Sequence, residues 1–374
     1  MKKYKICLIA HLNDLSGANK ALIDLACGLK DIYDVTVVVP RKGALMNELT
    51  KNGLKVKVIL SGTWVYKVDE AIIKRVTKRV LNFFGEYHYY RFYKKEKFDL
   101  IHYNSITYGC GARAAKLLNI PYIWHIRELA EENFRLSFFN RERSLQLINE
   151  SDRIVTISNF MLNKVKLLFE KKDIKVIYDG KKIKAKPQYH AVEGYKLALI
   201  GAIAEDKGQI DAVRALDHLN KKGRVLDLYL VGAVTDTQYH KKLLEEITPN
   251  IRNHVIFSGY QNDVREYRGS EYIALMCSKA EAFGLVTVEA MNDGQLIIGA
   301  NGGATSEIIQ DGICGYLYTP GNYVELAQKI ELLMASTDKK QFVENAYRNI
   351  NERFNISQTI KNVDELYQEL LDNG

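Results

Sequence analysis

Two glutamates, Glu281 and Glu289, are separated by seven residues in the segment of this chain that gives the clearest indication of a ligand site. Glu281 is followed by a Phe283–Gly284 turn, and a short apolar stretch then carries Glu289. An apolar run at 296–300 and a Gly302–Gly303 pair come next. The order predicts strand, turn, helix, strand and glycine-rich turn, the layout of a ligand site at the carboxyl edge of a parallel sheet. Carboxylates accept hydroxyl donors and helix-start amides bind anions, so the expected ligand carries both kinds of group.

A second turn with the same character spans residues 201–209. It follows a predicted buried strand, opens a predicted helix, and contains Lys207 directly before Gly208. A lysine ammonium is a compact point charge that suits a phosphate group. The alternative is a surface turn that only caps the helix.

The first half of the chain offers weaker signals. Gly17 precedes a predicted helix at a strand-to-helix turn, and a lone glycine there has little specificity. His125, Arg127 and Glu128 follow or end a predicted strand. A single histidine at a strand end is more often structural than catalytic, and Arg127 and Glu128 are expected to pair with each other.

Short apolar runs alternate with helical patterns from end to end, which is typical of parallel sheets covered on both faces. Strands are predicted at 4–10, 35–39, 56–60, 100–103, 122–124, 153–157, 175–177, 197–200, 226–231, 255–257, 273–276 and 296–299. Helices are predicted at 18–29, 45–52, 108–118, 142–150, 160–169, 209–222, 239–246, 286–291, 324–334 and 356–371.

The pattern divides the chain into two α/β domains. Segment 181–194 is basic, lacks periodicity and contains one of only five prolines, as an interdomain linker would. The expected domains are therefore 1–186 and 187–355, followed by a terminal helix in 356–374. A chain of 374 residues is long enough for two such cores.

Composition excludes several classes of protein. The five cysteines are scattered at no metal-ligand spacing, so neither disulfides nor a zinc site is expected. No apolar run reaches the ~18 residues of a membrane span, and the N-terminus resembles a buried strand more than a signal peptide. The net charge is +8, yet no nucleic-acid-binding motif is present. A cytoplasmic protein without a nucleic-acid partner is expected.

The Glu281–Glu289 segment, the Lys207 turn and the glycine pair together resemble the donor-sugar motif of family 4 retaining glycosyltransferases. The resemblance covers nearly the whole chain and is densest from 196 to 326. It implies the GT-B fold: two Rossmann-like domains facing across a cleft, with the last helix crossing back to the first domain. It also implies a nucleotide-sugar donor on the second domain and an acceptor on the first.

Site roles follow from the same resemblance. It places His125, Glu281 and Lys207 at the catalytic centre, with no protein nucleophile and no metal or other cofactor. Glu289 would bind the donor ribose, and the residue after Gly259 would pack on the base. The donor-binding residues that it implies are Gly17, Ala202, Lys207, Tyr260, Glu281, Ala282, Phe283, Gly284, Leu285 and Glu289. Acceptor contacts are expected at Asn104, Arg127 and Glu128.

Two departures keep other functions open. Ala202 stands where the family usually has an arginine, so Arg127 or Lys279 would have to supply the second cation at the diphosphate. Ala18 replaces one glycine of a common pair. A non-catalytic partner subunit and a GT-B sugar-nucleotide epimerase therefore remain alternatives.

Segment 68–98 interleaves basic and aromatic residues. Such a segment is either an interfacial patch for an anionic membrane or a basic helix with one face in the core. The first alternative would place the protein on the inner face of a cell membrane, near a lipid-linked acceptor. UDP-sugars and bacterial surface polysaccharides such as capsule or exopolysaccharide are the expected substrate classes.

Overall fold

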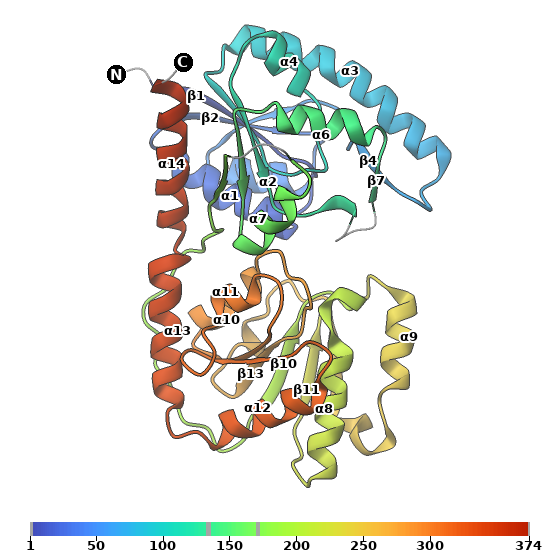
Figure 1. Cartoon of the computed structure of the whole chain (residues 1–374), viewed down its shortest axis with the longest axis vertical. Coiled ribbons are helices and arrows are strands. Elements are labelled where there is room, and N and C mark those ends of the chain that lie inside the picture. The colour runs from blue at the N-terminus through green and yellow to red at the C-terminus, as the bar shows by residue number, and fades with distance from the viewer. Residues whose placement is uncertain (1–2, 132–135, 170–172, 373–374) are drawn as a thin grey trace. The chain divides into compact units, whose positions relative to one another are not determined.

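The computed structural model describes residues 3–131, 136–169 and 173–372 of the chain. It divides into two compact units (Figure 1). The first unit holds residues 1–180 and 356–374, and the second holds residues 181–355. The second unit is thus inserted between the body of the first and its last helix.

The first unit is built on a seven-stranded sheet in the order β3-β2-β1-β5-β6-β8-β9. All six neighbouring pairs are parallel. A separate antiparallel pair is formed by β4 (Val65–Lys67) and β7 (Leu136–Phe138). The strands of the large sheet are β1 (Lys5–Ile9), β2 (Asp34–Val39), β3 (Lys55–Val58), β5 (Leu100–Tyr103), β6 (Tyr122–Ile126), β8 (Arg153–Thr156) and β9 (Ile174–Val176).

Helices cover both faces of this sheet. One face packs strand side chains such as Leu8 and Val37 against Leu25 of α1, Leu49 of α2 and the apolar residues of α14. The other face is aromatic: Tyr103 and Trp124 stack at 4.4 Å between ring centroids, and the Tyr103 hydroxyl lies 3.5 Å from that of Tyr93 in α3. The helices are α1 (Gly17–Leu29), α2 (Ala44–Lys51), α3 (Ile72–Glu96), α4 (Ala112–Leu117), α6 (Arg141–Asn149), α7 (Asn159–Lys166) and α14 (Ile356–Asp372).

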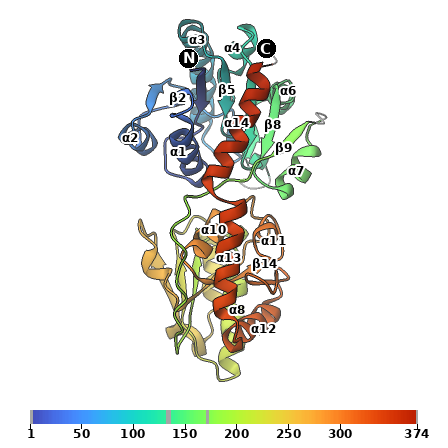
Figure 2. The same cartoon turned by 90° about the vertical axis from the view of Figure 1, so that its left-hand side faces the viewer.

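The C-terminal helix α14 completes the first core, as Figure 2 shows beside α1. Val363, Leu366 and Tyr367 are buried in the same cluster as the strands. The Tyr33 hydroxyl donates to Asp364 at 2.6 Å and adds a polar tie. The apolar stripe that predicted this helix is therefore the face that enters the first unit.

The second unit has a six-stranded parallel sheet in the order β12-β11-β10-β13-β14-β15. This is the doubly wound order that places a ligand site at the carboxyl ends of the central strands. The strands are β10 (Lys196–Ile200), β11 (Leu228–Val231), β12 (Val255–Gly259), β13 (Tyr272–Met276), β14 (Leu296–Ala300) and β15 (Tyr316–Tyr318).

Helices again cover both faces. Leu216 and Leu219 of α8 meet Leu326 and Ile330 of α12 in the larger core cluster. The helices are α8 (Gln209–Lys221), α9 (Thr237–Glu245), α10 (Leu285–Asn292), α11 (Thr305–Ile308), α12 (Tyr323–Ala335) and α13 (Lys339–Arg353), with short 3-10 turns η1 (Glu205–Lys207), η2 (Pro249–His254) and η3 (Arg265–Tyr267).

The two doubly wound units and the returning helix confirm the predicted fold class, while the facing of the two domains across a cleft stays a prediction. The division falls after Gly180, whereas the sequence placed it after residue 186. The difference has a physical cause, because Lys181 pairs with the backbone of Phe354 and Lys184 with Asn292, both in the second unit. The predicted helix at 108–118 is also shorter, since Gly111 has a φ of 92° and α4 begins only after it.

Candidate active site

Three turns meet at one edge of the second sheet. They follow the neighbouring parallel strands β10, β13 and β14 and span residues 201–208, 277–284 and 301–304. The carboxyl ends of parallel strands lie at the same sheet edge, so the three turns share one side of the unit.

An ion pair joins the first two turns. Lys207 Nζ lies 2.8 Å from Glu281 Oε2 and 3.5 Å from Asp206 Oδ2. Burial raises the pKa of the Glu281 carboxyl. The Lys207 charge and hydrogen bonds from Lys207 and Ser278 lower it by more, so the net effect is a lowered pKa. Burial also opposes the Lys207 charge, and Glu281 together with Asp206 raises the pKa of the ammonium. Both partners of the pair are therefore ionised at neutral pH.

Glycines bring the turn backbones into close contact. Gly303 has a φ of 57°, and a β-carbon there would lie 2.4 Å from the Glu281 nitrogen. The Ala304 N–H donates to the Glu281 carbonyl at 2.8 Å across the same contact. Gly208 is similar, because a β-carbon would stand 2.2 Å from the Cys277 carbonyl. Side chains at these positions would push the turns apart and displace the ion pair.

The turn after Glu281 leads directly into α10. Gly284 begins the helix with a φ of 100°, a left-handed conformation that favours glycine. Phe283 is buried and packs edge-on against Phe354 at 5.6 Å, which anchors the turn, while Ala282 and Leu285 are half-buried. The first N–H groups of a helix have no intrahelical acceptor, so this end of α10 offers donors and a positive dipole end to an anion.

Glu289 lies in the middle of α10 and is held by a cation that the sequence analysis missed. Arg268 Nη2 donates to Glu289 Oε2 at 2.7 Å, and Arg268 Nη1 lies 3.1 Å from Asp293 Oδ2. The second Glu289 oxygen is 3.8 Å from Lys181 Nζ. The carboxylate is 31% exposed, so part of it remains open to solvent.

The remaining predicted donor positions differ in exposure. Ala202 follows β10 and is half-buried, and its carbonyl accepts a bond from Gln209 at 2.8 Å. Tyr260 follows β12 and is 71% exposed. Lys279 is exposed in the turn after β13.

The first unit places a buried polar network beyond the ends of β5 and β6. Arg127 donates to Asn104 Oδ1 at 2.9 Å and forms an ion pair with Asp179. The Asn104 amide in turn donates to the Ala18 carbonyl at 3.0 Å in the first turn of α1. The predicted pairing of Arg127 with Glu128 is therefore wrong, because Asp179 neutralises the guanidinium across the sheet. This pairing also leaves Lys279, rather than Arg127, as the candidate second cation.

His125 is fully buried in β6. Its ring stacks on His102 of β5 at 5.4 Å, and its Nδ1 lies 3.4 Å from Arg127 Nη2. Burial, followed by the Arg127 charge, holds the pKa of His125 well below its usual value, so the ring is neutral. His102 Nδ1 and the Tyr367 hydroxyl lie 2.5 Å apart, which connects this histidine pair to α14.

The carboxyl group of Glu128 is buried in this network and has a raised pKa. It is 7% exposed and accepts a hydrogen bond from the Ser105 hydroxyl. Burial raises its pKa to about 7, against the opposing effects of Ser105 and Arg127. The carboxyl is therefore partly protonated at neutral pH, unlike Glu281.

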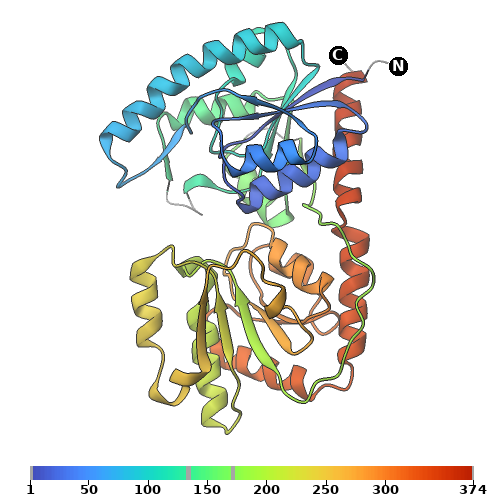
Figure 3. The same ribbon diagram turned by 180° about the vertical axis from the view of Figure 1, so that it is seen from behind.

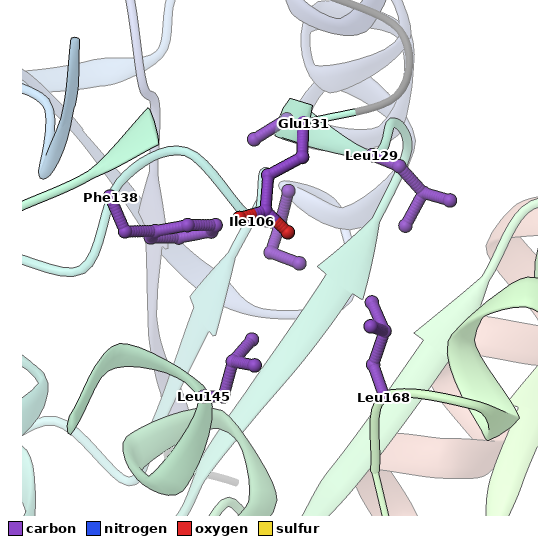
Figure 4. A pocket seen from close by; sticks show the side chains of 7 residues that line it. Ile106, Leu129, Glu131, Phe138, Leu145 and Leu168 are labelled. Atoms are coloured by element: carbon purple, nitrogen blue, oxygen red, sulfur yellow. The ribbon is translucent and has the colours of Figure 1, made fainter. Parts of the chain in front are cut away.

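A small apolar hollow of about 30 Å³ lies beside this network (Figure 4). Its lining residues come from the segments after β5 and β6 and from β7 and the α6 and α7 regions: Ile106, Leu129, Ala130, Glu131, Phe138, Leu145 and Leu168. Glu131 alone among them is charged, and it pairs with Arg141 at 3.0 Å.

Within the described residues, no group of three or more histidine, cysteine or acidic side chains is placed to hold a metal ion. The cations that the second unit presents at its sheet edge are lysines and an arginine. Any anion bound there would meet these side chains and backbone amides.

The sequence matches two known families of glycosyltransferase domains. Residues 15–181 match the family Glycosyltransferase Family 4, and residues 180–349 match Glycosyl transferases group 1. The chain belongs to the group 1 glycosyltransferases. The two matches meet where the two structural units divide.

The relatives of this glycosyltransferase have low sequence identity to it, but the similarity extends over most of the chain. It is 26% identical over 288 residues to an uncharacterized glycosyltransferase of Methanocaldococcus jannaschii, covering 75% of this chain and 78% of that one. It is 27% identical over 236 residues to the N-acetyl-alpha-D-glucosaminyl L-malate synthase of Bacillus anthracis, covering 60% and 61%.

Solved structures share its fold. Anabaena HepE, determined with UDP and glucose, superposes with a TM-score of 0.78 at 22% identity over 98% of this chain and 100% of that one. A glycosyltransferase from Rickettsia africae superposes with a TM-score of 0.80 at 19% identity over the full length of both.

The structure thus brings Lys207, Glu281 and the start of α10 together, and it sets Glu289 farther along the helix. It adds Arg268, Asp179 and Ser105 to the residues that sequence reasoning selected. Asp179 had a faint signal, since it lies in a Tyr-Asp-Gly turn directly after β9. Arg268 and Ser105 stand in no recognisable motif, and their roles come only from the fold.

Proposed function

We propose that this glycosyltransferase moves a sugar from a UDP-sugar to a glycan or lipid-linked glycan, with retention of anomeric configuration, in bacterial surface polysaccharide synthesis. The observation that carries the proposal is the Lys207–Glu281 ion pair at the sheet edge beside the start of α10. A cation and a helix N-terminus there suit a diphosphate, and a fixed carboxylate suits sugar hydroxyls.

The kinds of relatives support the substrate class. A segment of 159 residues is 29% identical to the poly(glycerol-phosphate) alpha-glucosyltransferase of Bacillus subtilis. Another of 176 residues is 26% identical to the lipopolysaccharide 1,2-N-acetylglucosaminetransferase of Salmonella typhimurium. Anabaena HepE has been solved with UDP-glucose. The names of the two transferases give a poly(glycerol phosphate) and a lipopolysaccharide as acceptors, and HepE was solved with a UDP-sugar. The proposal combines these two kinds of substrate.

In this proposal, each part of the nucleotide-sugar contacts a named residue of the second unit. The diphosphate contacts the Gly284 and Leu285 amides and Lys207, while the transferred sugar places hydroxyls on Glu281. Glu289 accepts the ribose hydroxyls through its exposed edge, because Arg268 occupies mainly one of its oxygens. The exposed Tyr260 ring stacks on the base.

The proposed reaction breaks the bond between the anomeric carbon and the phosphate oxygen. The acceptor oxygen forms the new bond on the same face of the sugar, and its proton passes to the leaving phosphate. Negative charge grows on that phosphate, so a fixed ammonium beside it stabilises the transition state more than the ground state. Lys207 supplies this charge because Glu281 keeps it protonated and in place. The proposal assigns no step to a metal ion.

The first unit supplies the acceptor side in this proposal. Asn104, Arg127 and Glu128 form its polar wall. The space at Gly17, at the start of α1, is open, since a β-carbon there would meet nothing within 4 Å. His125 is buried and neutral, so its role is to position Arg127 and, through it, the wall.

Thermal stability with UDP, GDP, dTDP, ADP and CMP tests the donor site. A ligand that binds only the native state raises apparent stability by mass action. UDP is expected to raise the midpoint in the wild type and to lose most of this effect in Glu289→Ala. Glu331→Ala, a surface glutamate of the same unit, serves as the control. A shift with none of the nucleotides would contradict the donor site and favour a non-catalytic subunit.

Product analysis separates transfer from epimerisation. The wild type with donor alone should leave the sugar nucleotide unchanged apart from slow hydrolysis, and NMR of the transfer product should show the anomeric configuration of the donor. An epimerised sugar nucleotide would contradict the transferase assignment. An inverted product would contradict retention alone.

A further inference from the structure

The helix α3 exposes an unusual amount of apolar surface. Its side toward the unit buries Tyr89 and Tyr93 together with several polar groups, whereas its outer side carries large apolar side chains. Seven large apolar residues of α3 are exposed, with Ile72, Ile73 and Phe83 each at 76%. The others are Val76, Val80, Phe84 and Tyr87. In the part of the chain that the structure describes, no other helix exposes more than one large apolar side chain.

The inner side of α3 explains why the helix takes this orientation. The Asn82 side chain accepts from the Gly62 N–H at 2.9 Å and donates to the Thr63 carbonyl at 3.2 Å. Lys78 pairs with Glu70 at 2.8 Å, and Glu86 accepts from the Gly111 N–H at 3.0 Å. These bonds fix the rotation of the helix, so the apolar side cannot turn inward.

The exposed apolar residues form one continuous stripe. At ~100° per residue they fall within an arc of about 120°, roughly opposite the bonded side. Figure 1 and Figure 3 show α3 along the edge of the first unit, and no other described element of that unit covers its outer side. A surface helix normally hides such a stripe, so the exposed stripe indicates a docking surface.

The charge of α3 identifies the occupant. The helix contains seven basic and two acidic residues. At ~100° per residue the exposed Arg79 and Lys95 fall just beyond its two borders, and the exposed Arg91 and Lys94 fall within its arc at the C-terminal end of the helix. A surface that is apolar in its centre and positive at its borders complements an anionic lipid bilayer, with rings at the boundary and ammonium groups among headgroups.

We propose that α3 docks this glycosyltransferase on an anionic membrane surface, lying in the plane of the interface. A second copy of the chain is a poorer occupant, because it would bring two positive surfaces together. The helix does not cross the bilayer: among the described residues, none forms a helix both long and apolar enough to span it. The proposal rests on α3 alone and is independent of the donor site.

Vesicle flotation tests the proposal with the full chain. Vesicles are made of phosphatidylcholine alone or of phosphatidylcholine and phosphatidylglycerol in equal amounts. The wild type is expected to float with the mixed vesicles, to float far less with phosphatidylcholine, and to be released in part by high salt because exposed charges are screened. Failure to bind the mixed vesicles would overturn the proposal.

Two variants separate the apolar and ionic contributions. Phe83→Ser/Phe84→Ser is expected to weaken partitioning by on the order of tenfold per ring, since each loses its apolar contact with lipid. Arg79→Glu/Lys95→Glu should remove the preference for phosphatidylglycerol, because both exposed side chains border the stripe. The matched control is Leu117→Ser/Leu167→Ser, which removes two apolar side chains outside α3 that are 74% and 83% exposed, against 76% and 56% for Phe83 and Phe84.

Light scattering after gel filtration completes the test. The side chains changed are exposed, so thermal midpoints and circular dichroism should match the wild type. Equal loss of binding in the control variant would overturn the assignment to α3. A dimer that dissociates in Phe83→Ser/Phe84→Ser, without vesicle binding by the wild type, would assign the stripe to a second copy instead.

Discussion

Lys207 and Glu281 act as one unit, because each determines the ionisation of the other. Burial disfavours both charges, and only their 2.8 Å contact with the bonds around it keeps them ionised. The two side chains are 28% and 26% exposed, so removing one member leaves the other charge half-buried without its partner, at a cost in stability. Single and double substitutions at this pair should therefore be far from additive.

Lys207→Met is expected to lower kcat by on the order of 10²–10³-fold, because it removes the positive charge beside the leaving phosphate. The Glu281 pKa should rise in the same variant, since burial then acts unopposed by the ammonium. Steady-state rates over a pH series measure both effects. Lys221→Met, an exposed lysine on α8, is the control, and a loss of less than about threefold would remove Lys207 from the mechanism.

Glu128 gives the first unit a pH-dependent stability. Its pKa is about 7 in the fold and lies near 4.5 in the unfolded chain, so the folded state holds the proton more tightly. Its contribution is therefore complete below the unfolded pKa and is lost as pH rises toward 7.

Glu128→Gln should remove this dependence. Between about pH 5 and pH 8, the wild type should lose roughly 2–3 kcal/mol of unfolding free energy relative to the variant. Denaturant titrations at the two pH values measure the difference. Glu142→Gln on α6 provides the comparison, and parallel curves for wild type and Glu128→Gln would contradict the raised pKa.

At the scale of elements, the site depends on how closely the turns after β13 and β14 approach. Gly303 and Gly312 both have left-handed φ angles, yet they differ in what a β-carbon would meet. At Gly303 it would lie 2.4 Å from the Glu281 nitrogen and 2.5 Å from the Glu281 carbonyl oxygen, whereas at Gly312 it would face open space. The two positions separate conformational strain from steric contact.

Gly303→Ala should lose both stability and donor binding, because the methyl group displaces the Glu281 backbone. A loss above about 2 kcal/mol is expected, against about 1 kcal/mol for Gly312→Ala, which has only the strained φ. Chemical denaturation and UDP titration report the two quantities. Equal effects of the two substitutions would show that the contact with Glu281 does not hold the turn.

The elements that carry the donor site could be predicted from sequence, and several others could not. β13 and α10 stand out because solid apolar runs bracket the glycine turns. β15 (Tyr316–Tyr318) and the β4–β7 pair have only three residues each, too few for a period to appear. The Arg127–Asp179 pair joins residues 52 positions apart, so only the sheet order reveals it.

At the scale of the whole molecule, the first unit needs both ends of the chain. Leu366→Ala removes a buried side chain from its core and should lower the stability of that unit by about 2–4 kcal/mol. The second unit contains no part of this core, so its transition should stay in place. Calorimetry with and without UDP distinguishes the two transitions, and Glu365→Ala on the exposed side of α14 is the control. A shared shift of both transitions would show that the units unfold together.

The insertion of the second unit also determines the order in which the two units can fold during translation. Residues 181–355 form a continuous stretch that can complete its sheet soon after it leaves the exit tunnel. Most of the first unit is synthesised earlier but lacks α14, and with it Val363, Leu366 and Tyr367, until the residues after 355 have been synthesised. The unit that is synthesised first is thus completed after the second unit, and a nascent chain released before residue 356 would carry an uncovered apolar face for chaperones to bind.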